Sequence, residues 1–478
     1  MKTVNRQAVV LIHGIGEQRP IETLRGFVEG IAKQSHKNKQ AKEEKTIFWD
    51  KPDPVSGNYE TRRMTMESDR GQDRPKTDFY EFYWAHNMRN TKFSHFKDWL
   101  FRIIFRRYKN VSKRLRFIYL LIWFLLLTLL AVIAVYGISW VVKTIHILSS
   151  GLIGFVIAAI FGIISYYLIT YLGDAGRYLD PSPDNIAERQ AIREDGMKLL
   201  KNLHKPGKYD RIIIIGHSLG SVIGYDLVKL LWNEYYKSFD EGIYAHSHRK
   251  KFDDKQVYCS EKVRKKLDEK HKELDEKNGE TLNKYKEALN EYQEAQTKSY
   301  QYLQAIGNKW LITDLLTIGS PLTHAGYLFV HEKNGLFEKL KEQGEYPTCP
   351  PTIQKKKPSD SGSYRDNIDK SKAFRIDSFD YPLRAKHFNH SSPFAVTKWT
   401  NIYYQSDFIG GPLRDVFGSG IKDIEKEIVR NKDKKEKKKK HIWRYITSHV
   451  LYWDFENPDN ILCDLCNILK VKNKLQTQ

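Results

Sequence analysis

Cysteine is scarce in this chain of 478 residues. Four cysteines are too few for the disulfide framework of a small secreted protein, and they favour a reducing compartment. Cys463 and Cys466 form a CxxC pair, but a zinc site needs four ligands and no second pair has suitable spacing. We interpret the pair as helix-facing cysteines. A phosphate-binding glycine-rich loop is also missing, and we expect neither a metal site nor a cofactor.

Acidic residues are also few, with 58 Asp and Glu against 79 Lys and Arg, which leaves a net charge of +21. Residues 97–116 carry +7 of this charge and residues 432–440 carry +5. Because the first patch leads directly into a long apolar run, we attribute the charge to membrane topology and expect no nucleic-acid partner. Lys432–Lys440 is either a solvated loop or a contact for anionic lipid headgroups.

Charge is missing altogether from Phe117–Val142 and from Ile147–Leu172, which are 26 residues each. Each run is long enough to span a bilayer as a helix, and the short link between them predicts a transmembrane hairpin over 117–172. A buried hairpin in a soluble protein is the alternative. The eight basic residues before the first run predict that both soluble parts lie in the cytoplasm. We therefore expect a two-pass integral membrane protein with membrane lipid as its partner and no cleavable signal peptide.

Short apolar runs alternate with amphipathic stretches in the remaining sequence, which predicts an α/β fold with a mostly parallel sheet. The expected strands are Gln7–Ile12, Asp78–Ala85, Arg211–Ile215, Leu315–Ile318 and Asn401–Tyr404, and the expected helices are Pro20–Lys33, Asn185–Leu203 and Ser221–Trp232.

A hydrophilic insert occupies residues 237–305. Within it Leu282, Tyr285, Leu289 and Tyr292 recur at the spacing of a heptad seam. The repeat is short, so we favour a helical hairpin packed against itself over a surface for a protein partner.

Gly216-His217-Ser218-Leu219-Gly220 is the strongest chemical signal. It follows four isoleucines and opens an apolar helix, which is the strand–turn–helix context that presents a nucleophilic serine. Glycine on both sides removes side chains that would collide in so tight a turn. The N–H of Leu219, at the start of a helix, would point into the site and bind an oxyanion.

His13-Gly14-Ile15-Gly16 follows the first expected strand. A glycine-rich turn at this place can supply a second oxyanion donor from the backbone, either Ile15 or Gly14. On its own this segment would indicate no more than a tight turn. Its occurrence together with the serine turn is what indicates an oxyanion loop.

These two segments, with GHSLGSVIGYD (216–226), TIGSPL (317–322) and WTNIYYQSDFIGGPL (399–413), resemble the α/β-hydrolase superfamily in its lipase and esterase branch. The resemblance implies a Ser–acid–His triad in that chain order. Asp407 lies three residues beyond the strand that should precede the acid, whereas Asp377 and Asp380 precede it. Only His441 and His449 follow Asp407. We prefer His449, beside an aromatic run, because His441 ends a lysine tract.

The resemblance also implies a domain organisation. We expect 1–96 to form the first part of an α/β-hydrolase domain, 97–116 a basic juxtamembrane segment, 117–172 the membrane hairpin, 173–236 the part with the serine turn, 237–305 the insert and 306–478 the remainder with acid and histidine.

The predicted function is a membrane-anchored serine hydrolase that cleaves carboxylic esters, as a lipase or phospholipase. Ser218 would attack the ester, His449 would act as base and then acid, and Asp407 would orient the histidine. The main alternative is a catalytically inactive hydrolase fold that serves as a membrane scaffold or partner-binding protein. A nucleic-acid-binding role rests only on net charge.

Overall fold

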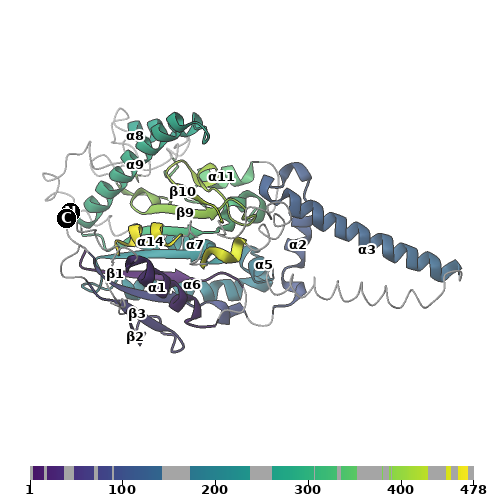
Figure 1. The fold of residues 1–478 in the computed structure, drawn as a ribbon, viewed down its shortest axis with the longest axis horizontal. Coiled ribbons are helices and arrows are strands. Elements are labelled where there is room, and N and C mark those ends of the chain that lie inside the picture. The colour runs from purple at the N-terminus through teal and green to yellow at the C-terminus, as the bar shows by residue number, and fades with distance from the viewer. Residues whose placement is uncertain are drawn as a thin grey trace, which may run out of the picture.

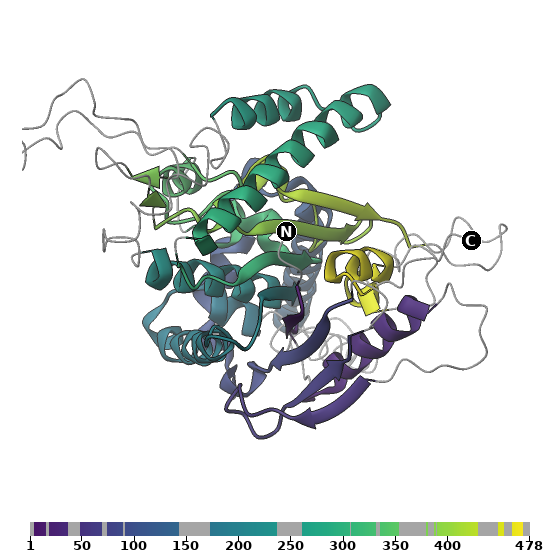
Figure 2. The same ribbon diagram turned by 90° about the vertical axis from the view of Figure 1, so that its left-hand side faces the viewer.

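The computed structural model of the chain describes residues 4–15, 19–36, 48–68, 74–88, 91–142, 173–236, 261–305, 307–330, 335–352, 379–380, 387–388, 390–428, 448–453 and 461–471. A twisted sheet of eight strands runs through the body (Figures 1 and 2), in the order β10-β9-β6-β5-β1-β4-β3-β2. The strands are β1 (Arg6–Ile12), β2 (Phe48–Pro52), β3 (Arg62–Met66), β4 (Lys76–Phe82), β5 (Arg211–His217), β6 (Ile312–Ile318), β9 (Lys398–Tyr404) and β10 (Lys422–Lys426).

The six strands from β10 to β4 are parallel, and β3 and β2 continue the sheet in antiparallel fashion. Central parallel strands are covered on both faces, which explains why β1 and β5 are nearly unbroken apolar runs. The predicted α/β class with a mostly parallel sheet is confirmed.

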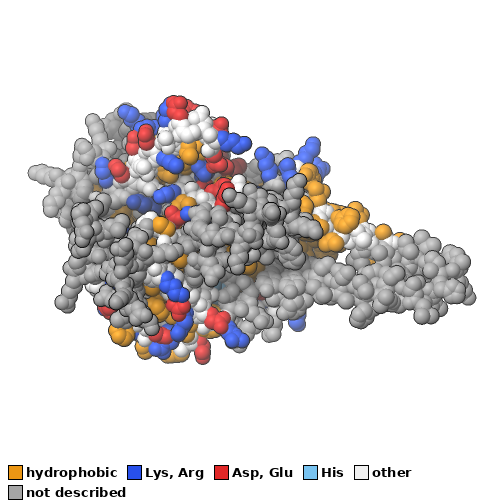
Figure 3. Space-filling view, in the orientation of Figure 1, with side chains coloured by type: hydrophobic (Ala, Val, Ile, Leu, Met, Phe, Trp, Pro, Cys, Tyr) orange, Lys and Arg blue, Asp and Glu red, His pale blue; other side chains and the backbone are white. Residues whose placement is uncertain are grey.

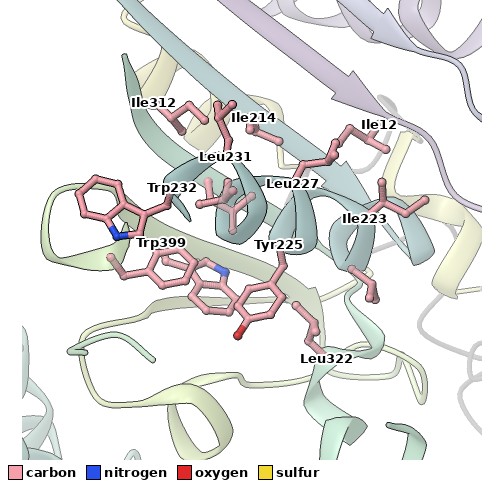
Figure 4. Close-up of a cluster of buried hydrophobic side chains, with 14 of the residues drawn as sticks. Ile12, Ile214, Ile223, Tyr225, Leu227, Leu231, Trp232, Ile312, Leu322 and Trp399 are labelled. Carbon is pink, nitrogen blue, oxygen red and sulfur yellow. The ribbon is translucent and has the colours of Figure 1, made fainter. Parts of the chain in front are cut away.

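Helices cover both faces of the sheet. On one face α1 (Glu22–His36) and α14 (Leu462–Leu469) pack on alternate residues of the strands, among them Leu11 and Ile213. On the other face lie α6 (Pro183–Leu203) and α7 (Leu219–Tyr235), and Ile12 and Ile214 face this layer. Figure 4 shows α7 side chains, including Leu227 and Leu231, against the strands. Each such buried side chain contributes about 1.5–3 kcal/mol to stability.

The strand order reverses direction between β1 and β5. From β1 the chain crosses to β2 at one edge of the sheet and returns through β3 to β4, beside β1. It then passes to β5, on the other side of β1, and proceeds outward through β6, β9 and β10. In open parallel sheets a crevice forms at such a point, beyond the carboxyl ends of the strands. The residues directly after β1 and β5 therefore lie at the natural binding position of this fold.

The insert contains α8 (Glu261–Lys272) and α9 (Gly279–Ala305), which pack on each other; residues 237–260 lie outside the described residues. The predicted seam does more than close this hairpin. Tyr285 donates a hydrogen bond to the carbonyl of Ser419 and Tyr292 to that of Phe394, and Leu289 is buried in the main core. The seam residues of α9 thus attach the insert to the body of the protein.

The described residues also form five short helices and a small antiparallel pair of strands. These are α2 (Lys97–Ile104), α5 (Gly173–Leu179), α10 (Ala325–Leu328), α11 (Leu336–Glu342), α12 (Arg414–Phe417) and β7 (Phe379–Asp380) with β8 (His387–Phe388).

The long helix α3 (Arg116–Val142) projects from one end of the molecule (Figure 1). The part of the chain that the structure describes holds no helix whose length and apolarity together suffice for a membrane span. Ile147–Leu172 lies outside the described residues. The prediction of a two-pass integral membrane protein with cytoplasmic soluble parts is therefore wrong.

Candidate active site

Ser218 lies at the turn between β5 and α7. Its φ of 52° and ψ of −127° are strained for a residue with a side chain, at a cost of about 1–3 kcal/mol. The turn is held because the Ser218 N–H donates to the carbonyl of Ile318 over 2.9 Å. A Cβ on Gly216 would lie 2.5 Å from Cα of Ser221, and one on Gly220 would lie 2.5 Å from the His13 carbonyl oxygen. Only glycine fits on either side of the serine.

His449 joins Ser218 to Asp407. Its Nε2 lies 2.8 Å from Oγ of Ser218, and its Nδ1 lies 2.9 Å from Oδ2 of Asp407. Because a carboxylate only accepts hydrogen bonds, Nδ1 donates to Asp407, and Nε2 is left to accept the Ser218 hydroxyl proton. All three side chains are buried, with exposed fractions of 4% for Ser218, 7% for His449 and 1% for Asp407. The structure thus brings the three predicted residues together in the predicted chain order.

The Asp407 carboxylate is held in its ionised form. Burial raises its pKa, but the charge and hydrogen bond of His449, with further hydrogen bonds from Gly410 and Tyr452, lower the pKa below its usual value overall. Its Oδ1 also accepts the N–H of Ile409 over 2.9 Å. Asp407 can therefore orient His449 and stabilise positive charge on the imidazole.

Tyr452 is a member of this group that the sequence reasoning missed. Its hydroxyl accepts the N–H of Tyr404 over 2.9 Å, so its own proton is free to donate to Oδ2 of Asp407, 2.8 Å away. Both His449 and Tyr452 belong to the 3₁₀ helix Ser448–Trp453. Residues three apart in a 3₁₀ helix share a side, and this spacing from His449 is the signal that could have identified Tyr452.

The turn after β1 lies against the serine. A Cβ on Gly14 would be 2.9 Å from Cβ of Ser218, so the backbone of this turn lies directly against Ser218. Ile15 follows and is partly buried against the main core, whereas Gly16 lies outside the described residues. Leu219 is the first residue of α7, so its N–H has no partner within the helix. Backbone N–H groups of both segments are thus close to Ser218.

His13 fixes this turn from inside the protein. Its ring stacks on Trp84 at 5.1 Å, and the Trp84 indole N–H donates to the His13 carbonyl over 2.9 Å. Burial lowers the pKa of His13 to about 4, so the ring is neutral at pH 7. His13 is a structural support for the turn.

His217 also lies beside the triad, but it has a different partner. Its Nε2 donates to the carbonyl of His449 over 3.2 Å, and burial lowers its pKa to about 3. Since a backbone carbonyl occupies this nitrogen, His217 orients the His449 segment. The competing candidates Asp377 and His441, and also Lys432–Lys440, lie outside the described residues, and Asp380 belongs to the separate β7–β8 pair.

A hydrogen-bond chain connects the serine turn to the loop after β6. Ser221 Oγ lies 2.5 Å from the carbonyl of Ser218 and 2.6 Å from Oγ of Ser320. The Ser221 hydroxyl is thus within donating distance of both oxygens, and Oγ of Ser320 also accepts the N–H of Leu322. This contact gives the Gly319-Ser320-Pro321 segment a role in holding the turn, which the motif alone did not reveal.

Within the described ranges no group of three or more His, Cys, Asp or Glu side chains is arranged to hold a metal ion. No family model, no curated protein and no solved structure matches the chain.

Proposed function

We propose that this protein is a serine hydrolase that cleaves carboxylic esters, built on the α/β-hydrolase fold. The observation that carries the proposal is the unbroken hydrogen-bond chain from Ser218 through His449 to Asp407. Ser218 and Asp407 follow β5 and β9 at the carboxyl ends of the parallel strands, and His449 belongs to the 3₁₀ helix Ser448–Trp453. The strained serine turn and the neighbouring backbone N–H groups support the same chemistry.

In the first half of the proposed reaction, Nε2 of His449 takes the Ser218 proton while Oγ attacks the ester carbonyl. The C–O bond to the alcohol then breaks, and the imidazolium returns the proton to the leaving alcohol. In the second half, water loses a proton to His449 and attacks the acyl-enzyme. The bond between the acyl carbon and Ser218 Oγ then breaks, the imidazolium returns its proton to Oγ, and the acid leaves. The N–H groups of Leu219 and Ile15 stabilise the oxyanion of both tetrahedral intermediates.

The proposed substrate is a lipid-type ester with an apolar acyl chain. Three exposed side chains near the start of α3 support this: Phe117, Leu120 and Phe124 have exposed fractions of 62%, 53% and 65%. Figure 3 shows hydrophobic side chains along the described part of α3. Exposed apolar surface of this kind marks sites that bind apolar groups. It begins three residues after Arg114, which contacts the turn that carries Asp407.

A fluorophosphonate probe tests the proposal before any natural substrate is known, because it labels only activated serines. The full-length protein should be labelled, and Ser218→Ala should not. Ser218→Ala should also lower hydrolysis of nitrophenyl esters by about 10³- to 10⁶-fold. The matched control Ser56→Ala, in the loop between β2 and β3, leaves Ser218 and His449 in place and should be labelled. Absence of labelling in the wild type would contradict the proposal and favour an inactive scaffold.

A further inference from the structure

The turn that carries Asp407 is held from outside by one arginine, Arg114. Its Nη1 lies 3.3 Å from the carbonyl oxygen of Gln405, 3.0 Å from that of Asp407 and 3.2 Å from that of Gly410. All three carbonyls belong to the six-residue segment Gln405–Gly410. The guanidinium also lies over the ring of Tyr403, 5.2 Å from its centroid. A single side chain therefore gathers the backbone on both sides of the carboxylate.

The fit between Arg114 and this turn leaves no spare room. A Cβ on Gly411 would lie 2.9 Å from Nε of Arg114, and one on Gly410 would lie 2.6 Å from Oδ2 of Asp407. The two glycines thus let the arginine approach from one side and the carboxylate fold back from the other. Movement of the guanidinium would release the carbonyls that define the turn.

A second contact attaches the same two segments. His324 Nε2 donates to the carbonyl of Phe408 over 2.9 Å, which leaves Nδ1 to accept the hydroxyl of Ser112, also at 2.9 Å. Burial lowers the pKa of His324 to about 4, which agrees with this neutral form. Ser112 and Arg114 lie two residues apart and hold adjacent parts of the acid turn.

The backbone that presents Arg114 is itself anchored. Arg106 donates to the carbonyls of Gly326 and Tyr327 over 3.2 and 2.7 Å, and Tyr327 donates to the carbonyl of Ile103 over 2.7 Å. Tyr119, in the first turn of α3, donates to the carbonyl of Arg106 over 2.7 Å. The segment before α3 is therefore fastened to the body and can act as a support.

We propose that Arg114 is a positioning residue for the reaction: it fixes the Gln405–Gly410 turn so that the Asp407 carboxylate meets Nδ1 of His449. This inference rests on the proposed function. Arg114, a residue of the basic segment 97–116, thereby has a role within the protein itself. Arginine suits the role better than lysine, because its planar group offers several donors in a fixed geometry.

Three variants test the inference: Arg114→Met, Arg114→Lys and, as the matched control, Lys113→Met, which removes the same charge from an exposed neighbour. Active sites are counted by titration with a fluorophosphonate, and kcat and KM are measured per titrated site on a soluble short-chain ester. Arg114→Met should lower kcat about 10- to 100-fold, since a shift of about 1 Å in a reacting group has this effect. KM should change less than twofold. The kcat of Arg114→Lys should lie between those of the wild type and Arg114→Met, and the kcat of Lys113→Met should match that of the wild type.

The split between kcat and KM and the partial rescue by lysine separate positioning from a general loss of stability, because titration counts only folded active sites. Wild-type kcat per titrated site in both Arg114→Met and Arg114→Lys would overturn the inference while the proposed function stands. If Arg114→Met does not fold, the kcat of Arg114→Lys decides. A wild type that no fluorophosphonate labels would remove the proposed function and this inference together.

Discussion

Two hydrogen-bond donors converge on Oδ2 of Asp407: Nδ1 of His449 at 2.9 Å and the hydroxyl of Tyr452 at 2.8 Å. The tyrosine has no means of taking part in proton transfer to the ester, because it faces the acid and not the serine. Its hydrogen bond fixes the position of Oδ2 and stabilises the negative charge of the carboxylate. At the scale of the residue, the proposed chemistry thus depends on groups that never touch the substrate.

Tyr452→Phe tests this contribution. A hydrogen bond to a charged group is worth about 1.5–3 kcal/mol, so we expect kcat/KM to fall about 10-fold or somewhat more. Tyr225→Phe is the matched control, because Tyr225 is equally buried, lies about two turns along α7 from Ser218 and donates to the carbonyl of Pro347. Both variants should lose stability in urea, and only Tyr452→Phe should lose activity per titrated site. Equal activity of the two would contradict the role assigned to Tyr452.

At the scale of elements, the site is assembled from loops that follow the carboxyl ends of neighbouring parallel strands. Ser218 follows β5, the His13–Ile15 turn follows β1, Asp407 follows β9 and Gly319 follows β6. Parallel strands place all these ends together. The loops between them then touch at van der Waals distance, so small residues at the contacts matter as much as the polar ones.

Gly410→Ala tests the closeness of these loops. The added Cβ would lie 2.6 Å from Oδ2 of Asp407 and 2.7 Å from Cα of Gly319, so the carboxylate must shift. We expect kcat to fall about 100-fold, measured per titrated site on a short-chain ester.

Gly26→Ala serves as its control, because a Cβ there, within α1, meets nothing within 4 Å. This second variant should keep full activity and gain about 0.5–1 kcal/mol of stability from the helix preference of alanine. Unchanged kcat in Gly410→Ala would show that the acid turn is free to adapt.

At the scale of the whole molecule, four of the described histidines, in different parts of the fold, have pKa values that burial lowers. Burial lowers the pKa of His13, His204 and His324 to about 4 and that of His217 to about 3. Each is neutral in the folded protein near pH 7. In the unfolded chain each regains a pKa near 6.5, so between pH 6.5 and about 4 the unfolded state binds more protons.

Stability should therefore be complete above about pH 6.5 and fall as the solution is acidified towards pH 4. Each histidine contributes up to about 1.4 kcal/mol per pH unit in this window. The measurement is the urea midpoint of unfolding, followed by tryptophan fluorescence, at pH values from 7.5 to 4.5. His204→Gln retains a donor for the carbonyl of Leu200 and should reduce the slope by about one quarter. A midpoint that does not change between pH 7 and 5 would contradict this account.

The sequence by itself determined the α/β class and the elements of its core. Apolar runs and helical periodicity identified β1, β4, β5, β6 and β9 and the helices α1, α6 and α7, because burial of a strand or helix face leaves a local pattern. The motif at 216–220 selected Ser218, and the chain order implied by the resemblance selected Asp407 and His449. The structure brings the three within hydrogen-bond distance. Whether they catalyse ester hydrolysis stays a prediction.

Other features had no local pattern to reveal them. The strands β2, β3 and β10 were missed, because they carry many charged residues at or near the sheet edges. The apolar run at 117–142 led to the wrong prediction of a two-pass membrane protein.

Only the tertiary structure showed which groups Tyr452 and Arg114 contact. Arg114 meets the turn of Asp407 across 293 positions of the chain, and its charge alone suggested a surface role. The periodicity of apolar residues in a short segment indicates which residues are buried. The partner of a polar side chain depends instead on which loops the sheet brings together. That choice depends on strand order, which no short segment of sequence contains.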